Sequence, residues 1–109
     1  MITSMNAAQV ITKANAAAHD ATDTYLRETG EHPFNCGFAW VTIKPARGAL
    51  VKEMKRQGIG RKGTYGGWQI WNPSESYTQD CSAKAAGARA YADVLSEYGV
   101  NVFAESRLD

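Results

Sequence analysis

The chain has 109 residues, enough for one hydrophobic core, and a domain of this size buries roughly two-thirds of its unfolded surface. Hydrophobic residues make up 44% and charged residues 21%, which are ordinary globular values and exclude an intrinsically disordered chain. No apolar run approaches the roughly 20 residues that a bilayer-spanning helix needs, and the polar, alanine-rich start lacks the pattern of a signal peptide. We therefore expect a single domain over residues 1–109 that stays in the cytoplasm of the cell that makes it.

The formal net charge is only +1, but the charges are unevenly distributed along the chain. Residues 44–62 hold seven basic side chains and one acid, Glu53, so this segment carries +6 and the rest of the chain carries −5. The basic residues are Lys44, Arg47, Lys52, Lys55, Arg56, Arg61 and Lys62. Such a concentration of positive charge favours an anionic partner for one face of the folded protein.

An N-terminal helix is predicted from about Ser4 to Glu28, within residues 1–30. Alanine is abundant there, Ser4 can cap the first turn, and Gly30 followed by Pro33 ends the helix. Apolar residues recur at spacings of three and four, at Val10, Ala14, Ala17, Ala18, Ala21 and Tyr25. Because alanine side chains are small, this stripe predicts a helix that lies close to a sheet.

The clearest strand pattern spans Cys36 to Ile43. Phe38, Trp40 and Thr42 point to one face, and Gly37, Ala39, Val41 and Ile43 point to the other. Apolar residues on both faces predict a central strand that is at least partly covered on both sides. A second helix is predicted from about Pro45 to Gln57, with Pro45 in its first turn and Gly58 as its cap.

The remainder of the chain predicts a loop, a strand, a helix and a strand. The loop covers residues 60–64, and the strand runs from Tyr65 to Trp71. The last helix is capped by Asp80 or Ser82 and ends at Gly99, and the last strand spans Val100 to Glu105.

The predicted order is therefore α-β-α-β-α-β, and the fold class is α+β, with a small three-stranded sheet packed with three helices. Residues 35–109 form the βαβαβ body. If the last two strands share a sheet, the helix between them makes a right-handed parallel crossover. A sheet this small has exposed edges, and a homodimer paired through one edge would cover it.

The segment from Lys55 to Gly63 is the first candidate for a binding site. Its glycines let the backbone approach a ligand, and its four cations can hold phosphate by charge and hydrogen bonds. The pattern is neither a P-loop nor a dinucleotide fingerprint, because no Gly-Lys-Ser/Thr follows and the loop joins a helix to a strand. A solvated basic face that complements the helix dipole is the alternative interpretation.

An aromatic run follows this loop directly, at Tyr65, Trp68 and Trp71. Tyr65 and Trp71 share one face of the predicted strand, where they could stack on the bases of single-stranded nucleic acid or of a nucleotide. Packing in the core or against another protein is the alternative for the tryptophans. The predicted ligand-binding residues are Lys55, Arg56, Gly58, Gly60, Arg61, Lys62, Tyr65 and Trp71.

No residue set supplies a nucleophile with a base and an orienting group, so we expect no enzyme and no cofactor. His19, His32, Cys36 and Cys81 lack the spacing typical of zinc sites, which predicts no metal. In a reducing cytoplasm the two cysteines are expected to be free thiols. A small cysteine-dependent enzyme is a third hypothesis, and it requires rapid labelling of the Cys36 thiol at neutral pH.

Several ordered motifs in residues 35–109 resemble a group of small uncharacterised proteins encoded by tailed bacteriophages. They are Cys-Gly-Phe-Ala-Trp-Val at 36–41, Gly-Gly-Trp-Gln-Ile-Trp-Asn-Pro at 66–73, the alanine-rich segment from Ala83 to Leu95, and the closing Ser-Arg-Leu-Asp. The resemblance implies an accessory protein that acts in the cytoplasm of an infected bacterium. It carries no activity and no functional residues to transfer.

Two main hypotheses follow. The first is a non-enzymatic protein that binds nucleic acid or a nucleotide through the basic, glycine-rich loop and the nearby aromatic side chains, with affinity that falls steeply with salt. The second is a protein-interaction module, such as an inhibitor of a host enzyme or of a defence system. Exposed Trp68 or Trp71, the sheet edge and the acidic outer helices would then form the contact.

Overall fold

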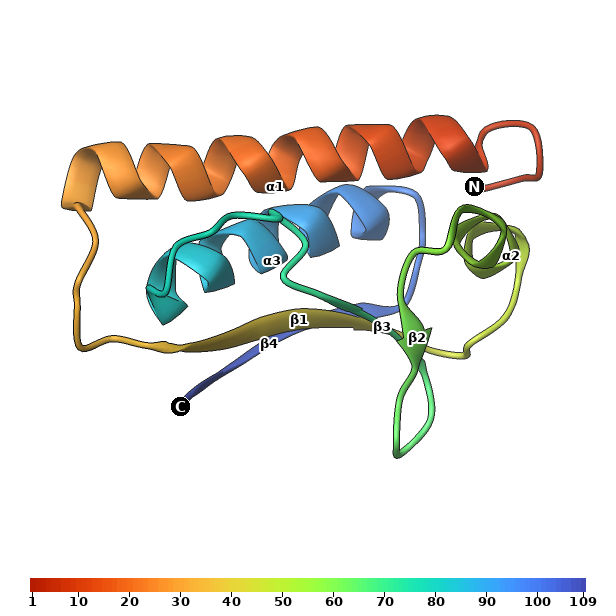
Figure 1. The fold of residues 1–109 in the computed structure, drawn as a ribbon. Helices are drawn as coiled ribbons and strands as arrows, with labels where there is room; N and C mark the ends of the chain where they lie inside the picture. The colour runs from red at the N-terminus through yellow and green to blue at the C-terminus, as the bar shows by residue number, and fades with distance from the viewer.

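The computed structural model describes residues 1–109 in full, as three helices and one four-stranded sheet. The elements in chain order are α1 (Ala7–Thr29), β1 (Gly37–Ile43), α2 (Ala49–Gln57), β2 (Arg61–Lys62), β3 (Trp68–Trp71), α3 (Cys81–Glu97) and β4 (Val102–Leu108). Figure 1 shows that α1 is the outermost layer, that α3 lies between α1 and the sheet, and that α2 stands at one end. The chain is thus one α+β domain, as predicted.

The sheet has the strand order β2-β3-β1-β4, and every neighbouring pair is antiparallel. Since β3 and β4 are both antiparallel to β1, they run parallel to each other and α3 forms the crossover between them. The predicted three-stranded sheet is wrong by one strand, because Arg61 and Lys62 pair with Gln69 and Trp68 where a loop was expected. The body therefore follows the β-α-β-β-α-β order of split βαβ folds.

Helix α1 packs on α3 and α2 rather than on the sheet that its alanine stripe predicted. Its buried residues are Ala7, Val10, Ile11, Ala14, Ala18 and Thr22. The two long helices lie very close together, since a Cβ added at Gly87 of α3 would lie 2.5 Å from Thr22 Oγ1. The first turn begins after Asn6 instead of Ser4, with Asn6 Oδ1 accepting a 2.7 Å hydrogen bond from the Thr3 amide.

Helix α2 begins at Ala49, so the expectation that Pro45 lies in its first turn is wrong. Gly48 has a φ of 102° and a ψ of 177°, which lies outside the helical region, and the helix starts only after it. The predicted end at Gly58 is confirmed: Gly58 is left-handed with a φ of 74°, and its amide contacts the carbonyl of Lys55.

Strand β1 separates two unlike faces of the sheet. Ala39, Val41 and Ile43 are buried toward α3, where they join a core that contains Tyr91 and Leu95. The opposite face carries Phe38, Trp40 and Thr42, as predicted from their alternation, but no helix covers it (Figure 1). The prediction that both faces of β1 are covered is confirmed only in part. Helix α3 covers one face, and only neighbouring side chains of the sheet cover the other.

The ends of the remaining elements follow local backbone chemistry. Strand β3 begins at Trp68 because Gly66 and Gly67 have φ values of 95° and 78°. Helix α3 has Asp80 as its N-cap, as predicted, and the carboxylate accepts hydrogen bonds from the amides of Ser82 and Ala83. None of the three helices is both long and apolar enough to span a bilayer.

Candidate functional site

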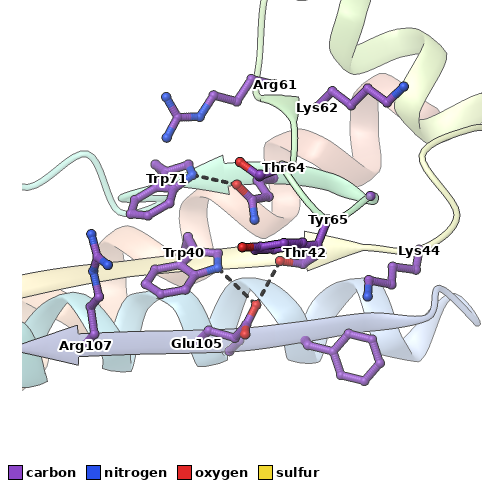
Figure 2. Close-up of a pocket in the computed structure, with 14 residues that line it drawn as sticks. Trp40, Thr42, Lys44, Arg61, Lys62, Thr64, Tyr65, Trp71, Glu105 and Arg107 are labelled. Carbon is purple, nitrogen blue, oxygen red and sulfur yellow. Dashed lines mark hydrogen bonds between the residues drawn. The ribbon is translucent and has the colours of Figure 1, made fainter.

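The sheet has one uncovered face, on the side away from α3 (Figure 1). We call it the open face. A hollow of about 1050 Å³ lies on it and extends to the turn between β2 and β3. Its lining residues are Trp40, Thr42, Lys44, Arg61, Lys62, Thr64, Tyr65, Gly66, Gln69, Trp71, Phe103, Ala104, Glu105 and Arg107, and Figure 2 draws all of them.

Strand register brings these side chains together from four segments of the sequence. Trp40 of β1 pairs with Trp71 of β3 on one side and with Glu105 of β4 on the other. One step along, Thr42 pairs with Gln69 and with Phe103, and Gln69 also pairs with Arg61 of β2. Paired residues share a sheet face, so all of these side chains lie on the open face.

Trp40 and Trp71 form a stacked pair at the centre of the open face, with ring centroids 4.5 Å apart and planes inclined by 18°. The guanidinium of Arg61 lies 5.0 Å from the centre of the Trp71 ring, on the side away from Trp40 (Figure 2). Phe38 meets Trp71 edge-on at 6.3 Å. Cation–π and aromatic contacts of this kind hold flat side chains in a fixed order across the strands.

Glu105 is the only acidic residue that lines the hollow. Its Oε2 accepts a hydrogen bond of 3.0 Å from Trp40 Nε1 and one of 2.9 Å from Thr42 Oγ1. The carboxylate forms no ion pair with any basic side chain of the hollow. Its orientation is therefore set by two neutral donors on the adjacent strand.

Positive charge dominates the hollow. Lys44, Arg61 and Arg107 direct their side chains to the open face, against Glu105 alone. Lys62 borders the hollow, but it pairs with Trp68 of the core side and its side chain points away (Figure 2). Three of these cations come from the basic segment 44–62, and Arg107 comes from β4 at the other end of the chain. A field of one sign in a concave surface attracts an oppositely charged ligand.

The structure brings together only part of the predicted ligand-binding set. Arg61, Lys62, Tyr65 and Trp71 line the hollow, and Gly60 lies beside it with Arg61 and Gln69. Gly58 caps α2. The other two predicted residues, Lys55 and Arg56, belong to α2 and do not line the hollow.

Both of these α2 cations, Lys55 and Arg56, make contacts with other side chains of the domain. The Lys55 ammonium lies 5.2 Å from the centre of the Trp68 ring, and Trp68 packs against the core instead of joining the open face. Arg56 Nη2 lies 2.5 Å from Glu53 Oε2. Hydrogen bonds from Arg56 and Gln57 lower the pKa of Glu53 to about 2, so the Arg56 charge is matched within its own helix.

Sequence reasoning missed the half of the hollow that β1 and β4 supply. The residues missed there are Trp40, Thr42, Lys44, Phe103, Ala104, Glu105 and Arg107. The alternation of Phe38, Trp40 and Thr42 was a usable signal, because it placed three side chains on the face opposite the aliphatic ones. Arg107 had no such signal, since the last strand was expected to end at Glu105 and extends to Leu108.

Comparison of the chain with protein-family models, with curated proteins and with solved structures finds no match. The resemblance to small phage-encoded proteins stays a prediction. The geometry of the open face is therefore the feature of the molecule that bears on its function.

Proposed function

We propose that the protein binds single-stranded nucleic acid on the open face and does not act as an enzyme. The observation that carries the proposal is the hollow itself, where stacked tryptophans and further exposed aromatic rings lie among three cations, Lys44, Arg61 and Arg107, on an uncovered sheet. Single strands are bound by this combination, because cations follow the phosphates while flat side chains stack on bases. A four-stranded sheet with aromatic residues on its inner strands serves this purpose in RNA-recognition modules.

The contacts favour particular roles for the aromatic side chains. Trp71 lies between Trp40 and Arg61, so a base can reach its ring only by displacing the exposed Arg61 side chain. Tyr65 is 95% exposed in the turn beside the hollow, and Phe103 is 49% exposed on β4. We assign base stacking to Tyr65 and Phe103, and we assign the positioning of Arg61 to the Trp40–Trp71 pair.

Phosphate contacts fall to the cations around these rings. Arg61 extends from β2 over the open face, and Lys44 and Arg107 extend from the ends of β1 and β4. Arginine offers planar paired donors to phosphate, while lysine acts as a compact point charge. Duplex DNA shields its base faces, so stacking on Tyr65 and Phe103 requires unpaired bases.

Equilibrium binding to a labelled single-stranded oligonucleotide tests the proposal. The double variant Arg61→Ala/Arg107→Ala is expected to bind about ten-fold more weakly or worse, because two charge-assisted contacts are lost. The matched control is Lys52→Ala/Arg89→Ala, which removes the same charge from exposed positions on α2 and α3. Equal weakening in both variants, or no binding by the parent protein, would refute the proposal. If the protein binds a duplex or a mononucleotide as tightly as the single strand, single-stranded nucleic acid is not its specific ligand.

A protein-interaction module remains the second candidate because of one feature, the free edge of β4. This seven-residue strand pairs only with β1, and its Leu108 is 67% exposed. An unpaired edge can accept a strand from another protein or from a second copy of this chain. Capture of a stoichiometric host protein that survives nuclease treatment, together with no affinity for oligonucleotides, would favour this candidate.

A further inference from the structure

Glu105 places a single carboxylate in a hollow that otherwise attracts anions. Trp40 Nε1 and Thr42 Oγ1 both donate to Oε2, at 3.0 Å and 2.9 Å, as the dashed lines in Figure 2 show. An oxygen that accepts two hydrogen bonds has used its lone pairs. Oε1 has no partner within the protein and is left as a free acceptor at the hollow.

A free carboxylate oxygen favours a hydrogen-bond donor on the edge of a base and disfavours an acceptor. Glu105 repels phosphate oxygens, so the backbone of a bound strand is directed toward Arg61, Lys44 and Arg107. A base is then left to lie over Glu105. Cytosine presents an amino group at its 4-position, which donates hydrogen bonds, whereas thymine carries an acceptor oxygen there. Uracil carries the same oxygen at its 4-position, so a carboxylate oxygen that faces this position meets a second acceptor. The one donor on this edge of uracil is the neighbouring N3–H, and the inference places Oε1 at the 4-position instead.

We propose that Glu105 makes the open face select cytosine over uracil. The inference rests on the proposed binding of single-stranded nucleic acid and names the residue that reads a base within that site. A hydrogen bond to a charged group typically carries enough free energy for about ten-fold discrimination, and we expect a preference of that size for oligo(dC) over oligo(dU).

The Glu105→Gln variant tests whether Glu105 selects the base. It predicts a result that would not arise if Glu105 only stabilised the fold. Trp40 and Thr42 still donate to the position of Oε2, so the amide oxygen must occupy it and the amide nitrogen must replace Oε1. The group that faces the base then changes from an acceptor to a donor. The preference should therefore reverse, with oligo(dU) bound more tightly than oligo(dC).

The two oligonucleotides share sugar, phosphate and length, which makes electrostatic effects equal for both. Glu97→Gln, an exposed position at the end of α3, is the control for loss of one negative charge and should keep the preference for oligo(dC). Thermal unfolding of Glu105→Gln checks that the variant keeps its fold. If it does not fold, the ratio of the parent protein's affinities for oligo(dC) and oligo(dU) tests the inference.

Each outcome has a separate consequence. A preference for oligo(dC) in the parent protein and in Glu97→Gln, with reversal in Glu105→Gln, supports the inference. Equal binding of both oligonucleotides by the parent protein, or an unchanged preference in Glu105→Gln, overturns it while the proposed binding function stands. Failure of the parent protein to bind either oligonucleotide overturns both.

Discussion

Trp40 and Trp71, which are 31 positions apart in the sequence, stack on neighbouring strands with ring centroids 4.5 Å apart and planes 18° from parallel. Two indoles held this close couple electronically, so we expect an exciton couplet in circular dichroism. We predict that Trp40→Phe and Trp71→Phe each abolish the couplet, because either substitution leaves only one indole of the pair.

The third tryptophan provides the control for that experiment. Trp68 lies on the core side of the sheet and donates to the Ile59 carbonyl at 3.0 Å. A couplet that persists in Trp40→Phe and in Trp71→Phe but disappears in Trp68→Phe would show that the stacked pair on the open face does not exist.

Salt dependence tests how many cations meet phosphate. Each phosphate neutralised on a single strand contributes a slope of roughly −0.7 to a plot of log affinity against log salt, so three contacts would give about −2. Arg107 lines the hollow from β4, and Arg107→Ala should reduce the slope by roughly 0.7. Binding isotherms over a salt series measure both values, and an unchanged slope in Arg107→Ala would remove this residue from the interface.

The buried carboxylate of Asp80 predicts a loss of stability in acid. Burial by itself raises the pKa of Asp80, but hydrogen bonds from the His32 main chain and the Asn35 side chain outweigh it and hold the pKa at about 2. An unfolded aspartate has a pKa of about 3.9, so the folded state favours the ionised form. The resulting stabilisation, about 2 kcal/mol, is complete above the unfolded pKa and disappears as pH falls through the folded pKa.

Urea unfolding at a series of acidic pH values checks this prediction. Asp80→Asn should be less stable at neutral pH and should show a flatter dependence between about pH 4 and pH 2. Asp93→Asn, an exposed change on α3, is the matched control and should follow the parent protein. If the acid dependence of Asp80→Asn is as steep as that of the parent, the hydrogen-bonded carboxylate is not its source.

Two buried hydroxyls predict opposite responses to removal. The Tyr91 hydroxyl is buried without a hydrogen-bond partner, and burial raises its pKa, with the charge of Glu75 as a further cause. The Thr22 hydroxyl donates to the Ala83 carbonyl at 2.8 Å. Tyr91→Phe should leave the free energy of unfolding unchanged or raise it by about 1 kcal/mol, whereas Thr22→Val should lower it by about 1 kcal/mol. Denaturant titrations compare them, and a marked loss in Tyr91→Phe would contradict the assignment.

Local chemistry explains which elements could be predicted from the sequence. The alternation from Phe38 to Ile43 identified β1 and both of its faces, and Asp80 and Gly99 bounded α3 correctly. These features depend on residues close together in the chain. The two-residue strand β2 could not be anticipated, because Arg61 and Lys62 become a strand only by pairing with β3.

The candidate site was half predictable for a related reason. Charge along the chain pointed to Arg61 and Lys62, and proximity in sequence added Tyr65 and Trp71. Proximity in sequence also wrongly grouped Lys55 and Arg56 with them, although α2 directs those cations elsewhere. The contribution of β4 depends on its register beside β1, which places Glu105 opposite Trp40, and no local pattern encodes a register between distant strands.

The three indole N–H groups provide the most direct test of the open face as the binding surface. Heteronuclear NMR resolves one indole signal for each tryptophan, and two of the three, Trp40 and Trp71, lie on the open face while Trp68 does not. On titration with a single-stranded oligonucleotide, we predict that the Trp40 and Trp71 signals shift in a saturable manner and that the Trp68 signal stays in place. Saturable binding that moves only the Trp68 signal, or none of the three, would contradict the account.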